Sequence, residues 1–242
     1  MSIASEITRL QQAKSDLATS ITNKGVTVPA ATTLDGYAAL VDQIQQGGTT
    51  EPPYDAEVEY LHSNGNQYID SGIECTGDLK VEFVGLITTN VNAAACGGIH
   101  TTSPYFRHHW SPYNNSFYWI QHSTETNASI SLSSSRDTWY TIIIDPANGT
   151  GSVNGSGKTF TALSASSTTG QNYFIFARKA SDGGVQSRPC RFKSFKMWRN
   201  NVLLRDFIPV RIGQVGYMYD KVSNKFFGNV GTGSFTLGSD KS

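Results

Sequence analysis

The sequence has little charge, little cysteine and no long apolar run. Only 16% of its 242 residues are charged, and 19 basic residues balance 19 acidic ones to a formal net charge of zero. Because binding to nucleic acid needs a marked basic excess, we expect no nucleic-acid partner. Since no apolar stretch reaches the length that spans a bilayer, we expect no membrane insertion.

The few cysteines and histidines do not have the spacing of a metal site. Cys75, Cys96 and Cys190 form no even framework, so we interpret them as small buried apolar residues, with one disulfide as the alternative. His108 and His109 are adjacent on a predicted strand, where neighbouring side chains point to opposite faces and cannot together chelate one ion. We therefore predict no metal site and no cofactor.

Signatures of common enzymes and of secretion are missing as well. The sequence contains no Gly-x-Ser-x-Gly elbow, no His-Glu-x-x-His pair and no phosphate-binding loop. The first residues lack the basic start and apolar core of a secretory signal. We therefore expect synthesis in the cytoplasm.

Turn-forming and aromatic residues, by contrast, are abundant. There are 23 glycines, and aromatic residues make up 11% of the chain. From Tyr54 to about Gly238, short runs of alternating apolar and polar residues are separated by turn residues, which is typical of a two-sheet sandwich or a barrel. The predicted strands cover residues 57–61, 67–71, 79–87, 105–109, 116–121, 128–132, 139–145, 150–153, 158–162, 172–178, 191–199, 202–209, 216–220 and 234–237.

The first 46 residues have a helical period instead. Apolar residues recur in alternating steps of four and three, a heptad seam of about three heptads with Lys14 in its one polar slot. Gly25 is expected to end this helix and Thr33 to cap a second short one. The seam residues, which we expect to mediate oligomerisation, are Ile3, Ile7, Leu10, Leu17 and Ile21. The apolar stripe of the second helix is Leu34, Tyr37, Ala38, Val41 and Ile44.

These patterns predict four segments. Residues 1–46 form a helical attachment or oligomerisation segment, residues 47–53 (GGTTEPP) a linker, residues 54–238 a β-sandwich and residues 239–242 a tail. So short a helical segment cannot bury both apolar stripes by itself, which favours self-association. The alternative is that both helices pack on the β-domain of their own chain.

Two stretches resemble known families. The stretch ITNKGVTVPAATTLDGYAALVDQI is similar to a module that is common near the start of bacteriophage tail and tail-fibre proteins. In that module a helix, an extended KGV turn and a second helix follow one another. The resemblance implies that the chain belongs to a virion tail and contacts other tail proteins. Together with the seam, it leads us to expect a homotrimer.

The second segment resembles the concanavalin A-like lectin/glucanase superfamily in its laminin-G-like form. The resemblance is carried by YLHSNGNQYIDSGI, by TWYTIIIDPANGTGSVNG and by three motifs near the end. Those motifs are Asp206-Phe-Ile-Pro209, Gly216-x-Met-Tyr-Asp220 and Gly231-Thr-Gly-Ser-Phe235. This resemblance implies a mainly β, two-sheet jelly roll of a kind that often binds glycans. Calcium occurs in some relatives, but the sequence has no dense Asp/Asn loop to hold it. The Asp, Pro and Gly residues of the three motifs are interpreted as structural.

The richest cluster of candidate binding residues runs from Tyr105 to His122. Sugar binding needs a flat aromatic face for the C–H surface of the ring and planar polar groups for paired hydroxyls. Residues 105–109 and 116–121 are predicted to form a hairpin with a loose turn at residues 111–115, so Arg107 and His109 share one face while Phe106, His108 and Trp110 lie on the other. The predicted ligand-binding residues are Arg107, His109, Trp110, Tyr113, Asn115 and Trp119. The alternative is that several of them pack in the core or across strands.

A basic run and the scattered acids complete the candidates. The run, which is interpreted as the solvated face of edge strands rather than as a site for an anionic polysaccharide, is Arg178, Lys179, Arg188, Arg191, Lys193, Lys196 and Arg199. Glucanases of the superfamily carry a Glu-x-Asp-x-x-Glu motif on one strand. This motif is absent here, where Glu57 and Glu59 share a face and Glu82 is alone, so we expect no catalysis.

Three functions follow from these observations. The first is a non-catalytic receptor-binding tail protein that binds host surface polysaccharide. The second is a structural tail, baseplate or decoration protein whose sandwich packs on its neighbours. The third is a polysaccharide depolymerase, which would need carboxylates that converge from different strands.

Overall fold

The computed structural model describes residues 2–43, 52–88, 97–102, 105–113, 116–122, 128–131, 137–166, 168–179 and 184–241. Only the backbone is described for residues 100–102, 105–113, 116–122, 128–131 and 169. The chain divides into two compact units, Met1–Pro53 and Tyr54–Ser242, each of which is considered by itself. Among the described helices, none has the length and apolarity that crossing a membrane requires.

The first unit contains two helices joined by an extended segment. Helix α1 (Ile3–Thr22) begins at Ser2, whose side chain accepts a hydrogen bond from the Ser5 backbone N–H. As predicted, Gly25 ends the helix: it has a φ of +84° and its N–H donates to the Thr22 carbonyl at 2.9 Å. Helix α2 (Gly36–Asp42) follows, with no side-chain cap at its start.

A small core lies between the end of α1 and α2. Ile21, Tyr37 and Leu40 are buried there, with Ala18, Val26 and Val28 packed against them. The predicted stripe on the second helix is therefore partly wrong, because Leu34 and Val41 are exposed and Leu40 is buried instead. In so short a helix, the contact with α1 decides which side chains are buried, and the spacing of the apolar residues does not. Thr33 is not the cap, and Ile44 lies outside the described residues.

The seam on α1 is mostly uncovered within this unit. Ile3, Ile7, Leu10 and Leu17 are 83%, 50%, 52% and 38% exposed, whereas Ile21 is only 1% exposed, in the small core. Burial of four apolar side chains along one helix therefore requires a partner outside the unit.

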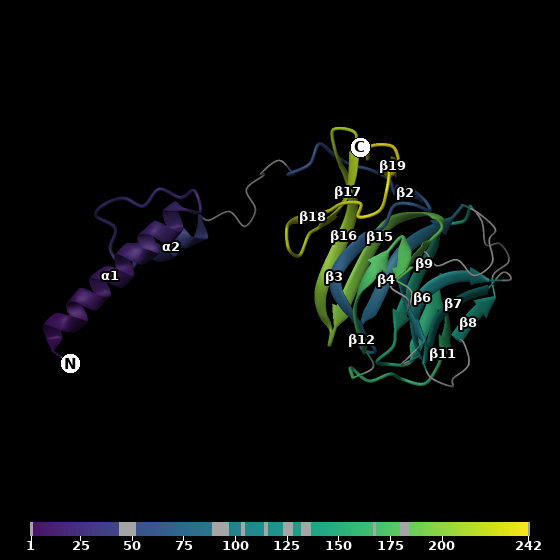
Figure 1. The fold of residues 1–242 in the computed structure, drawn as a ribbon. Coiled ribbons are helices and arrows are strands. Elements are labelled where there is room, and N and C mark those ends of the chain that lie inside the picture. Colours follow the sequence, from purple (N-terminus) through teal and green to yellow (C-terminus); the bar gives the residue numbers. More distant parts are fainter. Residues whose placement is uncertain are drawn as a thin grey trace. The chain divides into compact units, whose positions relative to one another are not determined.

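The second unit is mainly β and consists of two sheets in a sandwich, as predicted (Figure 1). The larger sheet, called the large sheet below, contains β1 (Ala56–Glu57), β2 (Leu61–Asn64), β4 (Lys80–Ile87), β9 (Tyr140–Asp145), β10 (Thr150–Val153), β11 (Ser156–Thr159), β15 (Pro189–Arg199), β16 (Val202–Ile212), β17 (Val215–Asp220), β18 (Lys225–Phe227) and β19 (Thr236–Leu237). The small sheet contains β3 (Ile69–Thr76), β5 (Gly97–Thr102), β6 (Tyr105–Tyr113), β7 (Ser116–His122), β8 (Ala128–Ser131), β12 (Thr168–Ile175), β13 (Ala177–Lys179) and β14 (Val185–Ser187).

The burial of side chains in the large sheet agrees with the apolar pattern of its strands. The main path of the large sheet is β11-β10-β9-β4-β15-β16-β17-β18, with β2 beside β15 and β1 beside β16. In β4, Val81 and Phe83 are buried while Lys80 and Glu82 face out, as their alternation predicts. Strand β9 lies between β10 and β4, in agreement with its apolar sequence.

A cluster of aromatic rings lies in the core between the sheets. The ring of Phe83 stacks on that of Phe195 at 4.9 Å between centroids, and the edge of Phe192 contacts both. From the small sheet, Tyr173 meets Phe195 at 5.7 Å. All four side chains are at most 1% exposed, so these contacts hold the two sheets together without solvent.

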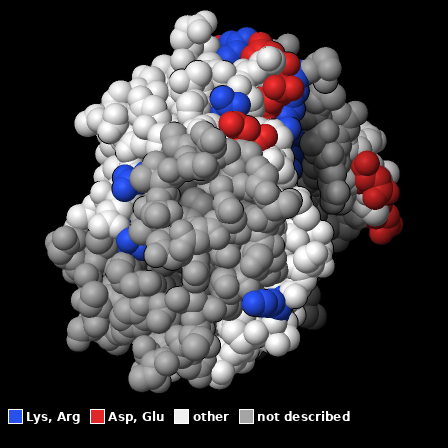
Figure 2. Space-filling model, turned by 90° about the vertical axis from the view of Figure 1, so that its right-hand side faces the viewer, with Lys and Arg blue, Asp and Glu red and all other residues white. Residues whose placement is uncertain are grey.

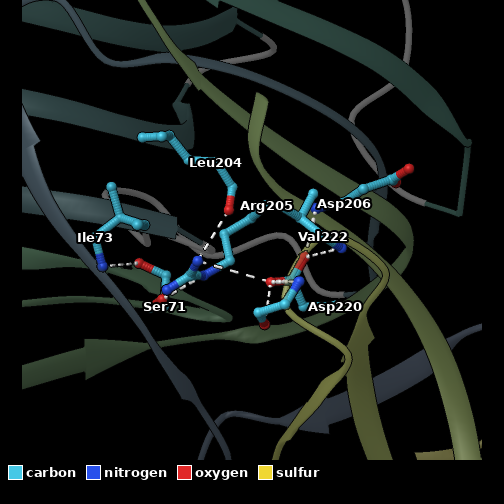
Figure 3. A network of polar contacts seen from close by, with 8 residues as sticks. Ser71, Ile73, Leu204, Arg205, Asp206, Asp220 and Val222 are labelled. Atoms are coloured by element: carbon cyan, nitrogen blue, oxygen red, sulfur yellow. Dashed lines mark hydrogen bonds and ion pairs between the residues drawn. The ribbon is translucent and has the colours of Figure 1, made fainter. Parts of the chain in front are cut away.

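One buried polar network also joins the two sheets (Figure 3). Asp220, at the end of β17, is fully buried and accepts hydrogen bonds from the backbone N–H groups of Asp206 and Val222. Arg205 lies 3.7 Å from its carboxylate and donates to the Ser71 carbonyl of the small sheet at 3.1 Å. The interpretation of Asp220 as a structural residue is confirmed.

Two glycines of the same C-terminal motifs are required by close packing. A Cβ on Gly216 would meet the side chains of Leu61 at 2.6 Å and Leu237 at 2.7 Å, and a Cβ on Gly231 would overlap the Asn66 carbonyl oxygen. The predicted tail also contacts the sandwich, since Asp240 forms a bridge with Val58 and accepts from Arg211 at 2.7 Å.

Some strand predictions were wrong. β5, β14 and β18 were not predicted, and residues 160–162, predicted as strand, lie beyond β11. β5 begins with Gly97 and Gly98, which have low strand propensity, so the local pattern does not predict a strand there.

Candidate ligand-binding face

The predicted hairpin is present and longer than expected. β6 pairs with β7 in antiparallel fashion, with Arg107 opposite Gln121, and β6 continues to Tyr113, which pairs with Ser116. The loose turn predicted at residues 111–115 is therefore wrong for Ser111–Tyr113, which belong to the strand. Asn115 lies outside the described residues.

The register shows which positions of β6 lie on the outer face of the small sheet. On the side of β5, Arg107 pairs with His100 and His109 with Gly98, whereas His108 pairs with Ile99. Ile99 is fully buried in the core between the sheets. Since paired residues share a face and neighbours alternate, the positions of Arg107 and His109 belong to the outer face.

A β-bulge lies at the two predicted tryptophan positions, and Trp110 pairs with Gly97, the neighbour of Gly98, so by alternation its position belongs to the other face. Between the pairs His108–Ile120 and Ser111–Tyr118, β6 has the two residues His109 and Trp110 where β7 has only Trp119. Trp119 is two positions from Gln121, the partner of Arg107, so its position belongs to the same outer face. Tyr113, whose partner Ser116 is three positions from Trp119, lies at the end of the hairpin on the other face by the same alternation.

Next to these positions, β3 and β12 carry side chains that the sequence analysis did not select. Phe174 pairs with Gly98 on one side and with Asp70 on the other. The ring of Tyr68 stacks on Phe174 at 5.2 Å, so Phe174 is only 6% exposed while Tyr68 remains partly exposed. The Asn172 side-chain amide donates to the Asp70 carboxylate at 3.3 Å.

The loop before β19 fixes the position of Tyr68. Its backbone N–H donates to the Asn229 side chain at 3.0 Å, and its carbonyl accepts from the Val230 N–H at 2.9 Å. We call the whole surface the small-sheet outer face. It consists of the side chains of Tyr68, Asp70 and Asn172, of Lys179, whose ammonium lies 5.7 Å from the centre of the Phe174 ring, and of the strand positions of His100, Arg107, His109, Trp119 and Gln121.

The described side chains of this face provide the groups that hold a sugar, and the two acids of β3 lie too far apart to act as a glycosidase pair. The amide of Asn172 and the carboxylate of Asp70 are planar, and Tyr68 presents an aromatic ring. The nearest acid on the same strand, Glu74, is four residues from Asp70, or about 13 Å in an extended strand. Glycosidases need two carboxyl groups about 5–5.5 Å or about 6.5–9.5 Å apart.

The other chemically notable residues have structural surroundings. Cys75 and Cys190 are fully buried, and burial raises the pKa of the Cys75 thiol well above its usual range. Cys96 lies outside the described residues. Glu57 accepts from the Tyr54 hydroxyl at 3.2 Å. Within the described part of the chain, no three His, Cys, Asp or Glu side chains gather closely enough to hold a metal ion.

The basic run is divided among several environments. Arg178 donates to Gln186, and Arg199 lies 3.5 Å from the Asp78 carboxylate, so these two guanidinium groups have protein partners. Arg191 and Lys193 lie on the outer side of the large sheet instead. On the face drawn in Figure 2, the described acidic and basic side chains are few and intermixed, in keeping with the net charge of zero.

Comparison with known proteins gives limited information. No family model matches the sequence, and no curated protein matches it. Nine chains of solved structures match, among them a proposed carbohydrate-binding protein from Bacteroides ovatus, with a TM-score of 0.49 and 12% identity. That match covers 77% of this chain and 61% of the other, so the chain spans less than two thirds of that protein.

Proposed function

We propose that the chain is a non-catalytic receptor-binding component of a phage tail, and that its sandwich binds host-surface glycan through the small-sheet outer face. The observation that carries the proposal is the register of β5, β6 and β7, which brings the positions of Arg107, His109 and Trp119 to one outer face. Beside them lie the partly exposed Tyr68 and the Asn172–Asp70 pair. Aromatic and planar polar groups on one surface suit the two sides of a sugar ring.

The phage part of the proposal is supported by the first unit. Its sequence resembles the starting module of tail and tail-fibre proteins, and Ile3, Ile7, Leu10 and Leu17 form an exposed apolar seam on α1. A seam of this kind is buried when copies of the helix associate. We propose a homotrimer attached to other tail proteins in the virion, with the sandwiches displayed for host binding.

Binding of the full chain to a panel of capsular and cell-wall polysaccharides tests the proposal. One polysaccharide of the panel should bind, and Arg107→Ala and Trp119→Ala should each weaken its binding about tenfold, the effect of losing a stacking or charge-assisted contact. The control is Thr141→Ala, an exposed residue on the other sheet, which should leave the affinity unchanged.

The same experiment separates the alternatives. If no polysaccharide binds, or if both variants bind like the unchanged protein, the glycan proposal is wrong. The structural tail or decoration role would then be favoured, because Val202, Val215 and Val230 are exposed on the sandwich and could pack on a neighbour. Release of reducing ends from the bound polysaccharide would show a depolymerase instead.

A further inference from the structure

The outer side of the large sheet carries a second group of aromatic and basic side chains. The guanidinium carbon of Arg191 lies 4.7 Å from the centre of the Tyr60 ring, and the Lys193 ammonium lies 4.4 Å from the centre of the Trp139 ring. The two rings are 5.9 Å apart. These four residues and His62 form what we call the cation–aromatic patch.

Segments far apart in the sequence build this patch. In β15, Arg191 and Lys193 alternate with the buried Phe192, so both face outward, and the bulge that follows lets Phe195 return to the core. β2 pairs with the first half of β15 and places His62 opposite Arg191. Tyr60 precedes β2, and Trp139 precedes β9.

The floor of the patch is apolar and its rim is accessible. Leu86 of β4 pairs with Arg191 and is only 3% exposed although it lies on the outer side of its strand. Tyr60, Trp139, Arg191 and Lys193 are all partly exposed. A ligand can therefore reach both the rings and the cations.

The positive charges of the patch are not neutralised by the described protein. Arg199, Arg205 and Arg211 each have a carboxylate within 4.0 Å, whereas neither Arg191 nor Lys193 has one among the described residues. Nε of Arg191 and Nε2 of His62 are buried atoms for which the described structure offers no hydrogen-bond partner. Burial and the charge of Arg191 lower the pKa of His62, as expected where positive charge is uncompensated. Buried polar atoms normally have partners, and an acidic ligand would supply an acceptor to Nε of Arg191.

We propose that the cation–aromatic patch binds the carboxylate of an acidic sugar, such as a uronic acid in an anionic polysaccharide. A carboxylate accepts two parallel hydrogen bonds from a guanidinium group, and Lys193 adds a second positive charge. Tyr60 and Trp139 supply aromatic surface for the sugar ring that carries the carboxylate. This site differs from the proposed glycan site in its sheet, its charge and its ligand, so each can fail independently of the other.

Matched neutral and anionic polymers test the proposal. The full chain should bind polygalacturonate and bind its fully methyl-esterified form at least about tenfold more weakly, since esterification removes only the charge. Arg191→Gln and Lys193→Gln should each weaken the binding of polygalacturonate about tenfold. Raising the salt concentration should also weaken it, as expected for an exposed ionic contact.

Two controls make the result specific. Lys196→Gln removes a positive charge from the same strand, but Lys196 is paired in the sheet with Glu82 and Asp206, so binding should not change. Val185→Ala changes an exposed residue of the small sheet outside the small-sheet outer face and should leave the binding of polygalacturonate intact. A bound carboxylate should also raise the pKa of His62, which NMR titration of its ring protons measures even if Arg191→Gln fails to fold.

The proposal is overturned if the esterified polymer binds as well as the acid, or if polygalacturonate leaves the His62 pKa unchanged. Equal weakening by Lys196→Gln and Lys193→Gln would also overturn it, because non-specific attraction to any lysine would then explain the binding.

Discussion

Asp220 is the residue on which the C-terminal strands depend most directly. Its carboxylate is fully buried and accepts from three backbone N–H groups, those of Asp206, Val222 and Ser223, and from the Ser223 hydroxyl at 2.6 Å. Arg205 supplies the opposite charge at 3.7 Å and donates onward to the small sheet. A charge buried so deeply persists only when its hydrogen bonds are complete.

Replacement of Asp220 should therefore cost much more stability than replacement of Asp206, a partly buried acid nearby. Asp220→Asn places an NH2 group against donors and leaves Arg205 without its counter-charge, so the free energy of unfolding should fall by about 2–4 kcal/mol. Asp206→Asn, which only removes an ion pair with the half-exposed Lys221, should cost less than about 1 kcal/mol. Urea denaturation of the full chain measures both, and equal losses would contradict the structural role of Asp220.

His62 should make the stability of the sandwich depend on pH. Burial and then the charge of Arg191 hold the pKa of His62 below its usual value of 6.5. The unfolded chain therefore binds this proton more readily, and the free energy of unfolding should fall as the pH drops below about 6.5 toward the lower pKa of the folded state. Denaturation of the unchanged protein and of His62→Gln between pH 7.5 and pH 5 should show a shallower decline for the variant.

A variant of Arg191 tests whether His62, rather than another histidine, causes this decline in stability. Arg191→Gln removes the repulsive charge but keeps His62, so it should reduce the same decline only in part. A decline that is equally steep in all three proteins would show that His62 does not contribute to it.

At the scale of helices and strands, the exposed seam of α1 makes a sharp prediction. Leu10→Asp places a charge in the middle of the apolar seam and should convert the expected trimer into monomers, because a buried unpaired carboxylate is too costly in a helix interface. Ser15→Asp, an exposed residue off the seam, should leave the assembly intact. Light scattering during size-exclusion chromatography gives the molar mass of each, and a monomeric unchanged protein would refute the role of the seam.

Elements with a clear local period could be predicted from the sequence. The alternation of β4 correctly places Val81 and Phe83 in the core, and Gly25 correctly ends α1. β5 could not be found in the same way, because its first residues are glycines, which have low strand propensity. Helix α2 has too few residues for its period to select the buried face.

For the candidate face as well, only the features set by local alternation could be predicted from the sequence. The sharing of one face by Arg107 and His109 follows from a period of two and agrees with the register. The position of Tyr113 does not follow, because the bulge at His109 and Trp110 and the extra length of β6 change its place. Tyr68 and Asn172 were missed because their partners, Phe174 and Asp70, are about a hundred positions away in the sequence, a distance that no local pattern covers.

At the scale of the whole molecule, the two units have complementary properties. The sandwich contains its own core and both sheets within Tyr54–Ser242, so that fragment has what it needs to fold alone. The first unit has a core of only three buried residues and an apolar seam that its own chain leaves open. If that seam joins copies of the chain, each oligomer carries several binding faces. Several weak contacts with a repetitive glycan surface then give a higher overall affinity than one contact.

Comparison of the full chain with residues 54–242 should separate intrinsic affinity from this multivalent effect. Both should bind a soluble oligosaccharide with the same Kd, because the small-sheet outer face lies entirely within the fragment. On a densely coated glycan surface the full chain should bind at least about 100-fold more tightly, since further contacts of an oligomer form at high effective concentration. Surface plasmon resonance at low and high coating density measures the difference. Equal surface affinities would mean that the helical unit serves attachment alone, while loss of the soluble affinity in the fragment would place part of the binding site in the first 53 residues.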